Sequence, residues 1–241
     1  MLALPRPQAI LFDLGDTLLT EEAHDLSAGL CALLSDPELP TLPDPESGER
    51  LASELSSSIE RTRARPPEEF SVRDWLGAVL APGSGKALLQ QAEHRFFRGC
   101  ARLSPAPGVH DLLDELAAEQ VPLAAVSNAI WSSRVLAAEL ERHGLRRSFA
   151  TIVSSADLGI RKPDPAPFHQ ALRRFGVEAV DAWYVGDSFG NDVVGAVGAG
   201  LSAVWLDASD AAAPGSEPHQ RIRSLTDLID LQRQSAARPD R

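Results

Sequence analysis

Short apolar runs alternate with stretches of helical periodicity along much of the chain. Strands are predicted for the apolar runs at 9–12, 123–126, 149–153, 183–185 and 201–206. Apolar residues recur at helical spacing between those runs, which predicts helices at 108–119, 132–143, 165–175 and 192–200. This β-α-β-α order predicts a parallel sheet with right-handed crossovers, which is a Rossmann-like α/β core.

The segment from 20 to 103 interrupts this alternation and has no convincing strand pattern. Helices are predicted at 22–34, 49–65, 71–80 and 86–98, with a Pro-rich acidic loop at 36–48 and a break at 82–85. After residue 207 we expect a loop and a last helix at 224–232. The predicted organisation is a core of residues 1–19 and 104–233, a mainly helical insert at 20–103, and a disordered tail at 234–241.

Polar residues follow three of the predicted strands, where the carboxyl ends of parallel strands meet at one edge of a sheet. The residues are Asp13, Gly15, Asp16 and Thr17 after the first run, Ser127 and Asn128 after the second, and Asp187 and Asp192 after the run at 183–185. Lys162 lies in an Arg-Lys-Pro-Asp-Pro turn between two of these strands. We therefore expect these scattered residues to form one site.

Four of these residues carry groups suited to binding an anion. The Thr17 and Ser127 hydroxyls and the Asn128 amide can donate hydrogen bonds to phosphate oxygens. Lys162 is one of only two lysines in the chain, and its ammonium can offset the charge of a carboxylate and a phosphate together. Taken singly, each of them is equally compatible with a turn or a surface position.

Three of the acids can act as metal ligands. Asp13 can bind a cation or attack a phosphoryl group. Asp187 is placed as a ligand for a hard cation such as Mg²⁺, which prefers a few carboxylates together with water and phosphate. Asp192 can reach the metal through water or orient Lys162. The structural alternative for each is a turn or a helix N-cap.

The composition of the chain limits the kinds of partner that we expect it to bind. The formal net charge of −11 argues against nucleic acid, which is bound by clustered Lys and Arg. No apolar run approaches the roughly 20 residues of a membrane span, and no signal-peptide pattern begins the chain, so we expect a cytoplasmic protein without a membrane partner. Cys31 and Cys100 lie far apart and are expected to be buried free thiols.

As a set, the motifs resemble the haloacid dehalogenase-like hydrolase superfamily. The matching pieces are Phe-Asp-Leu-Gly-Asp-Thr-Leu at 12–18, Ser127-Asn128, Lys162-Pro163-Asp164, and Gly186-Asp187-Ser188 with Asp192. The resemblance covers about residues 7–20 and 104–207. The insert resembles the helical cap of the phosphoglycolate phosphatase-like branch in its location and helical character.

This resemblance implies a Mg²⁺-dependent phosphatase. Asp13 would form an aspartyl-phosphate that water then hydrolyses. Mg²⁺ would be held by the Asp13 carboxylate, the Gly15 carbonyl and Asp187, with Asp192 in or near the outer shell. Thr17, Ser127 and Lys162 would stabilise the phosphoryl oxygens, and the cap would close over a small phosphorylated substrate. A monomer and a homodimer both fit the sequence.

The chain departs from the family pattern at one position. The family's phosphatases usually carry an acid two residues after the nucleophile, where this chain has Gly15; Asp16 follows one place later. Proton transfer contributes roughly 10²–10⁴-fold to such reactions. Three hypotheses follow: a phosphatase in which Asp16 substitutes or which is slow, a weak or inactive metal- and phosphate-binding protein, and a metal-free 2-haloacid dehalogenase.

Overall fold

The computed structural model describes residues 4–36, 48–80, 85–209 and 211–235. Most of the predicted loop at 36–48, of the break at 82–85 and of the tail at 234–241 lies outside these residues.

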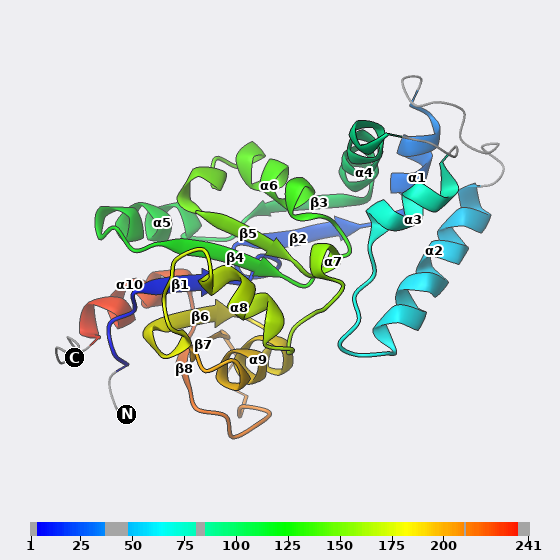
Figure 1. The fold of residues 1–241 in the computed structure, drawn as a ribbon. Helices are drawn as coiled ribbons and strands as arrows, with labels where there is room; N and C mark the ends of the chain where they lie inside the picture. The colour runs from blue at the N-terminus through cyan, green and yellow to red at the C-terminus, as the bar shows by residue number, and fades with distance from the viewer. Residues whose placement is uncertain (1–3, 37–47, 81–84, 210, 236–241) are drawn as a thin grey trace.

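A six-stranded parallel sheet forms the centre of the fold (Figure 1). In spatial order its strands are β5 (Thr151–Ser154), β4 (Leu123–Ser127), β1 (Ala9–Phe12), β6 (Ala182–Gly186), β7 (Ser202–Leu206) and β8 (His219–Ile222). The chain adds β4 and β5 on one side of β1 and then β6 to β8 on the other. The strand order therefore reverses at β1, and ligands of such sheets bind at this reversal. The predicted α/β fold is confirmed.

Strand β8 was not predicted, and its surroundings explain why. Its sequence is His-Gln-Arg-Ile, and only Ile222 is buried. It pairs with β7 alone at the edge of the sheet, so most of its side chains need not be apolar. An edge strand of this kind has no apolar run that would reveal it in the sequence.

Alternate residues of β1 face two separate apolar layers. Ile10 and Phe12 pack into the layer that also contains helices α5, α6 and α10, whereas Ala9 and Leu11 pack against α8 and α9. The helices of the core are α5 (Val109–Ala118), α6 (Ser133–Arg142), α7 (Ser155–Leu158), α8 (Ala166–Leu172), α9 (Val194–Gly198) and α10 (Leu225–Gln234). Short 3₁₀ turns occupy Arg146–Ser148 and Ala179–Asp181. Burial on both faces is what the continuously apolar runs predicted.

Several helix boundaries differ from the prediction. The helix expected at 192–200 begins earlier, with a wide π-type turn at Phe189–Val193 that continues into α9. Gln234, the first residue of the expected tail, still belongs to α10, and residues 236–241 lie outside the described residues. Gln232, two residues before the end of α10, is buried and donates to Glu119 Oε2 at 3.0 Å, which fixes this end of the helix to the core.

The described residues of the inserted segment form four helices that lie together to one side of the sheet (Figure 1). They are α1 (Leu26–Leu34), α2 (Gly48–Arg63), α3 (Val72–Val79) and α4 (Lys86–Cys100). The amphipathic patterns predicted these helices, although α1 begins four residues later than expected. Cys100 is buried as predicted, whereas Cys31 is exposed, because α1 turns Gly29, Leu30 and Leu33 inward instead.

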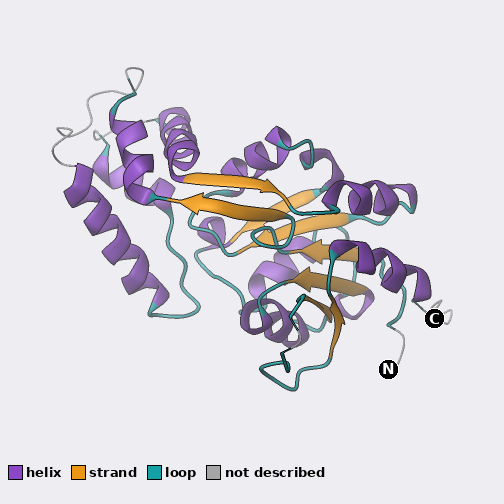
Figure 2. Cartoon of the chain, turned by 180° about the vertical axis from the view of Figure 1, so that it is seen from behind, coloured by secondary structure: helices purple, strands orange, loops and turns teal. Residues whose placement is uncertain are grey.

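The insert is mainly helical, but it also contains strand structure that was not predicted from the sequence. Strand β2 (Leu19–His24) pairs antiparallel with β3 (Ala101–Pro105), and this ribbon joins the inserted helices to the core (Figure 2). Side chains of β2 after Leu19 are exposed on both faces, so the strand has no alternating pattern in the sequence. The predicted limits of the insert fall within or beside these two strands.

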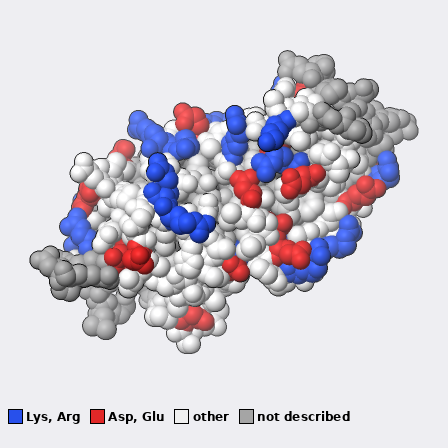
Figure 3. Space-filling view, viewed as in Figure 1, with Lys and Arg blue, Asp and Glu red and all other residues white. Residues whose placement is uncertain are grey.

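Basic and acidic residues are interspersed on the face of the molecule shown in Figure 3. None of the helices among the described residues has the length and apolar character needed to cross a bilayer.

Candidate active site

Three strand ends bring predicted site residues to one cavity. Asp13 directly follows β1, Ser127 ends β4 and Asp187 directly follows β6. These three strands are neighbours in the sheet, so their carboxyl ends lie side by side. A cavity of about 220 Å³, here called the phosphate cavity, is lined by Asp13, Gly15, Asp16, Ser127, Asn128, Lys162, Asp187, Ser188 and Asn191. Seven of the nine candidate site residues predicted from the sequence are among them; Thr17 and Asp192 lie behind the wall, both buried.

Lys162 is a buried ammonium surrounded by oxygen atoms. Its Nζ lies 2.8 Å from Asp13 Oδ1, 2.7 Å from Asp192 Oδ1, 2.6 Å from the Tyr184 hydroxyl and 3.1 Å from the Val126 carbonyl. Burial alone lowers the pKa of Lys162, but the Asp13 and Asp192 carboxylates outweigh it and the net pKa is raised. The lysine is therefore a fixed positive charge beside Asp13.

Asn128 holds the backbone of Lys162. Its Oδ1 accepts from Lys162 N at 2.8 Å, and its Nδ2 donates to Lys162 O at 3.0 Å. The side chain thereby connects the end of β4 to the lysine turn, which sets where the Lys162 ammonium lies. The second N–H of Asn128 Nδ2 is not used by this pair of bonds, and phosphate binding by Asn128 stays a prediction.

Tyr184 is a site residue that the sequence analysis missed. Its hydroxyl accepts from Lys162 and lies 3.1 Å from the Val126 carbonyl and 3.2 Å from Asp192 Oδ1. Burial and the nearby Asp192 carboxylate raise the pKa of Tyr184 well above its usual range. It is the only tyrosine in the chain and lies within an apolar strand. A buried tyrosine needs a hydrogen-bond partner, and this need was the sequence feature that could have pointed to Tyr184 as a site residue.

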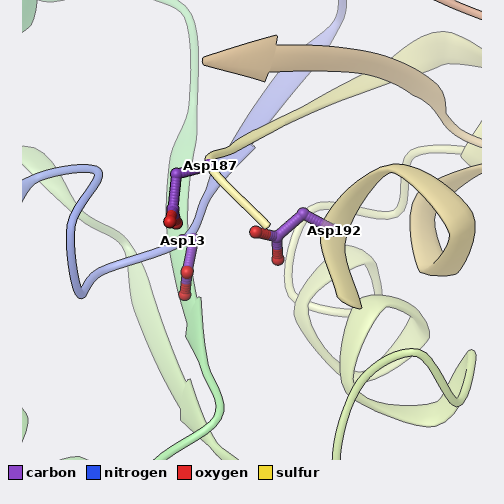
Figure 4. Close-up of side chains that lie close together, drawn as sticks. All are labelled: Asp13, Asp187 and Asp192. Atoms are coloured by element: carbon purple, nitrogen blue, oxygen red, sulfur yellow. The ribbon is translucent and has the colours of Figure 1, made fainter. Parts of the chain in front are cut away.

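The carboxylates of three acids lie close together (Figure 4). Asp13, Asp187 and Asp192 each offer a carboxylate oxygen, and these oxygens lie within 4.8 Å of one another. Burial raises the pKa of Asp13 to about 7, against the opposing effect of Lys162. Burial also raises the pKa of Asp187, and the Asp192 carboxylate adds to this effect. A cluster of desolvated negative charges attracts a cation.

Asp192 is the most firmly held of the three acids. Its Oδ1 accepts from Lys162, and its Oδ2 accepts from Ser188 N at 2.9 Å. A Cβ at Gly186 would lie 2.5 Å from Asp192 Cγ, so only glycine leaves room for this carboxylate. Of the two roles considered for Asp192, these bonds support orientation of Lys162.

Asp187 is supported from both sides. The buried Thr17 hydroxyl donates to Asp187 Oδ1 at 3.3 Å, and the Trp205 indole donates to the Asp187 carbonyl at 2.8 Å. Thr17 lies outside the residues that line the cavity, and its hydroxyl orients the Asp187 carboxylate. Phosphate binding by Thr17 stays a prediction.

A left-handed backbone is usually adopted by glycine, but in this loop Asp16 adopts it, with φ of 54°, and the neighbouring Gly15 does not. The Asp16 Oδ1 accepts from Glu21 N on β2 at 3.3 Å. A Cβ at Gly15 would meet no atom within 4 Å, so the backbone leaves space for an acid where the chain has none.

The haloacid dehalogenase-like hydrolase family model matches residues 10–206 of this chain. The chain belongs to this family. A phosphoglycolate phosphatase from Chromobacterium violaceum is 30% identical, and the match covers 93% of this chain and 96% of that protein. The predicted family, its phosphoglycolate phosphatase-like branch and the hydrolase class are thereby confirmed.

Two other members of the family differ in what their names say they act on. A phosphoserine phosphatase from Thermus thermophilus is 31% identical over 66% of this chain, and the match spans 64% of that protein's length. The solved 2-haloacid dehalogenase from Pseudomonas syringae pv. Tomato is 28% identical, with a TM-score of 0.61 and coverage of 96% of this chain and 98% of that one. Family membership therefore establishes the fold. Which bond the protein cleaves has to be inferred from the residues of the site.

Proposed function

We propose that this chain is a phosphatase that uses Mg²⁺ to hydrolyse a small phosphorylated metabolite, with Asp13 as the nucleophile. The observation that carries the proposal is the Asp13 carboxylate in a small polar cavity, 2.8 Å from a buried ammonium and beside two further acids. The phosphatase names of the matching relatives support the same class.

The donor set fits a hard divalent cation. Asp13 and Asp187 present carboxylate oxygens in the cavity, and oxygen donors with room for water are what Mg²⁺ prefers. Asp13, Asp187 and the Gly15 carbonyl would hold the metal, with Asp192 behind them. When bound, Mg²⁺ would neutralise charge on the phosphoryl oxygens.

Asp13 carries the chemistry. One carboxylate oxygen attacks phosphorus, the bond from phosphorus to the ester oxygen breaks, and that oxygen leaves with the electron pair. Water then attacks phosphorus in the acyl phosphate, so that inorganic phosphate leaves and the Asp13 carboxylate is restored. Catalysis of this kind depends mainly on positioning and charge stabilisation.

The remaining residues hold Asp13 and the phosphoryl group in place. Lys162 and the Ser127 hydroxyl line the cavity and would contact the phosphoryl oxygens. Asn128 and Asp192 orient Lys162, and Thr17 orients Asp187. In this scheme Asn128, Asp192 and Thr17 act through their neighbours.

The substitution Asp13→Asn tests the nucleophile. We expect loss of turnover by at least 1,000-fold on any phosphate ester that the wild-type protein hydrolyses, with an unchanged circular dichroism spectrum. Asp114→Asn, an exposed position on α5, is the matched control and is expected to keep full activity. Turnover that survives Asp13→Asn rejects Asp13 as the nucleophile.

Two observations favour other candidates. Gly15 removes the usual acid and favours a weakly active or inactive protein that still binds metal and phosphate. The solved 2-haloacid dehalogenase favours attack on carbon instead. A halide leaving beside three carboxylates would be repelled, which argues against that reaction here. Absence of turnover with retained Mg²⁺ binding would identify the first alternative, and metal-independent halide release the second.

A further inference from the structure

A second cavity continues from the phosphate cavity toward the inserted helices. It has a volume of about 370 Å³ and is called the ester pocket here. The two cavities share Gly15, Asp16, Ser127 and Asn128 as lining residues. A phosphate held beside Asp13 can therefore extend its ester group into the ester pocket.

The wall of the ester pocket is mainly apolar and aromatic. It includes Leu26, Ile59, Phe97, Leu103, Ile130 and Trp131. The rings of Phe97 and Trp131 meet edge to face with centroids 5.3 Å apart. A planar aromatic group can extend such an arrangement and gains from leaving water.

Three of the four charged or titratable side chains that line this pocket lie in ion pairs, and the fourth, Asp16, accepts a hydrogen bond from Glu21 N. His24 Nδ1 lies 3.2 Å from Glu21 Oε2, and Arg63 Nε lies 3.8 Å from Glu69 Oε1. A sugar in this pocket would place several hydroxyls against apolar walls, and each buried hydroxyl without a partner opposes binding. The pocket therefore disfavours polyhydroxylated ester groups.

The position two residues after Asp13, where relatives usually carry the acid, offers no side chain that could protonate a poor leaving group. Gly15 has no side chain, although a Cβ there would meet no atom within 4 Å. The Asp16 carboxylate is bonded to Glu21 N on a left-handed backbone. Without a general acid, an alkoxide leaves slowly, whereas a phenol, with a pKa of about 10, leaves as the phenolate.

We propose that the substrate is a phosphate monoester of a phenol, with the aromatic ring bound in the ester pocket. This inference rests on the proposed phosphatase function. In the first step the bond from Asp13 to phosphorus forms, the bond from phosphorus to the aryl oxygen breaks, and the phenolate departs with the electron pair. It takes its proton from water after release.

Steady-state kinetics with Mg²⁺ and matched esters test the substrate class. Phenyl and 2-naphthyl phosphate present an aromatic ring and an acidic leaving group, benzyl phosphate presents the ring on a poor leaving group, and glucose 6-phosphate presents neither. We expect kcat/KM at least 100-fold higher for the two aryl esters than for benzyl phosphate, with glucose 6-phosphate lowest. Equal or faster turnover of glucose 6-phosphate overturns the aryl assignment and leaves the phosphatase proposal standing. No turnover of any ester by folded protein rejects both.

Two loop variants test the missing acid independently of binding. Gly15→Asp is expected to raise kcat for benzyl phosphate by at least 10-fold more than for phenyl phosphate. Asp16→Ala is expected to leave the dependence of log kcat/KM on leaving-group pKa unchanged within a series of substituted phenyl phosphates. A steeper dependence would identify Asp16 as the proton donor and overturn this part of the proposal.

Phosphonate inhibitors test the aromatic pocket without any leaving group. Benzylphosphonate is expected to inhibit at least 10-fold more tightly than methylphosphonate. Leu26→Gln, at a half-buried wall position at the start of α1, is expected to remove most of that difference while leaving methylphosphonate inhibition unchanged. Equal inhibition of the wild-type protein by the two phosphonates overturns the pocket assignment.

Discussion

At the scale of single residues, the site depends on which oxygen atoms accept hydrogen bonds from the buried Lys162 ammonium. The Lys162 ammonium has three N–H donors and four oxygen acceptors within 3.1 Å. Two of the acceptors are the buried carboxylates of Asp13 and Asp192, so the lysine holds together charges that would otherwise be unpaired in the interior. The Tyr184 hydroxyl is the acceptor that the lysine can lose without leaving a donor unpaired.

This difference predicts unequal effects of two substitutions on stability. Lys162→Met leaves two buried carboxylates unpaired and is expected to reduce the free energy of unfolding by about 3–5 kcal/mol. Tyr184→Phe leaves all three lysine donors paired and is expected to cost about 1 kcal/mol. Urea denaturation at pH 7 without added metal measures both. A larger loss for Tyr184→Phe than for Lys162→Met would contradict this account of the cluster.

Gly186 gives a second prediction at this scale. Because a Cβ there would lie 2.5 Å from Asp192 Cγ, Gly186→Ala is expected to displace Asp192, lower activity more than 10-fold and cost about 1–3 kcal/mol of stability. The matched control is Gly190→Ala in the same loop, where a Cβ would meet no atom within 4 Å. Equal activity and stability of the two variants would show that Asp192 can move away from a Cβ at position 186 without any loss.

At the scale of elements, the inserted helices are bonded to the core beside the site. Glu93 on α4 accepts from the backbone N and the hydroxyl of Ser132 at 2.7 Å each, and so caps the start of α6 from another helix. On the same stretch of the core, Val72 at the start of α3 donates to the Ile130 carbonyl at 2.9 Å. These bonds adjoin Trp131, so they set the wall of the ester pocket.

The buried Glu93 carboxylate predicts a pH dependence of stability. Burial raises the pKa of Glu93 above its usual 4.5, and the hydrogen bonds from Ser132 only partly oppose this. The folded protein therefore keeps this proton at pH values where the unfolded chain has lost it. The stability that Glu93 contributes is complete below pH 4.5 and is lost as pH rises through the raised pKa.

Comparison with Glu93→Gln isolates this contribution, since glutamine can still accept from Ser132 without ionising. The wild-type protein is expected to lose stability relative to Glu93→Gln between pH 5 and pH 8. Chemical denaturation of both proteins at the two pH values measures the difference. A constant difference would mean that the pKa of Glu93 is not raised by folding.

At the scale of the whole molecule, the topology gathers acids that the chain keeps far apart. Asp13 and Lys162 are 149 residues apart in sequence and meet because Asn128, after β4, holds the Lys162 backbone and β4 lies beside β1. The resulting cluster of acids around one lysine carries excess negative charge. Binding of a divalent cation to the folded state should therefore stabilise the entire fold.

Mg²⁺ is thus expected to raise the melting temperature in a concentration-dependent way. At a concentration of 100 times the dissociation constant the gain is about 2.7 kcal/mol, and EDTA should reverse it. Asp187→Asn removes one carboxylate of the cluster and is expected to abolish most of the shift, whereas the exposed control Asp114→Asn should keep it. Differential scanning calorimetry measures the effect, and an equal shift in Asp187→Asn would exclude Asp187 as a ligand.

Features that depend on local burial could be predicted from the sequence. Continuous apolar runs predicted the strands buried on both faces, and the polar residues of the motifs predicted most of the residues that line the phosphate cavity. The ribbon of β2 and β3 and the edge strand β8 escaped prediction, because exposed strands carry no apolar period.

The hydrogen-bond partner of each polar group became known only from the three-dimensional fold. Asn128 bonds to Lys162, Thr17 bonds to Asp187, and Tyr184 faces the lysine, none of which follows from the residue type or from its neighbours in the chain. The ester pocket likewise joins residues of the insert and the core that lie far apart in sequence. A side chain's burial is set largely by its own segment, whereas its hydrogen-bond partner is set by where the rest of the chain folds back.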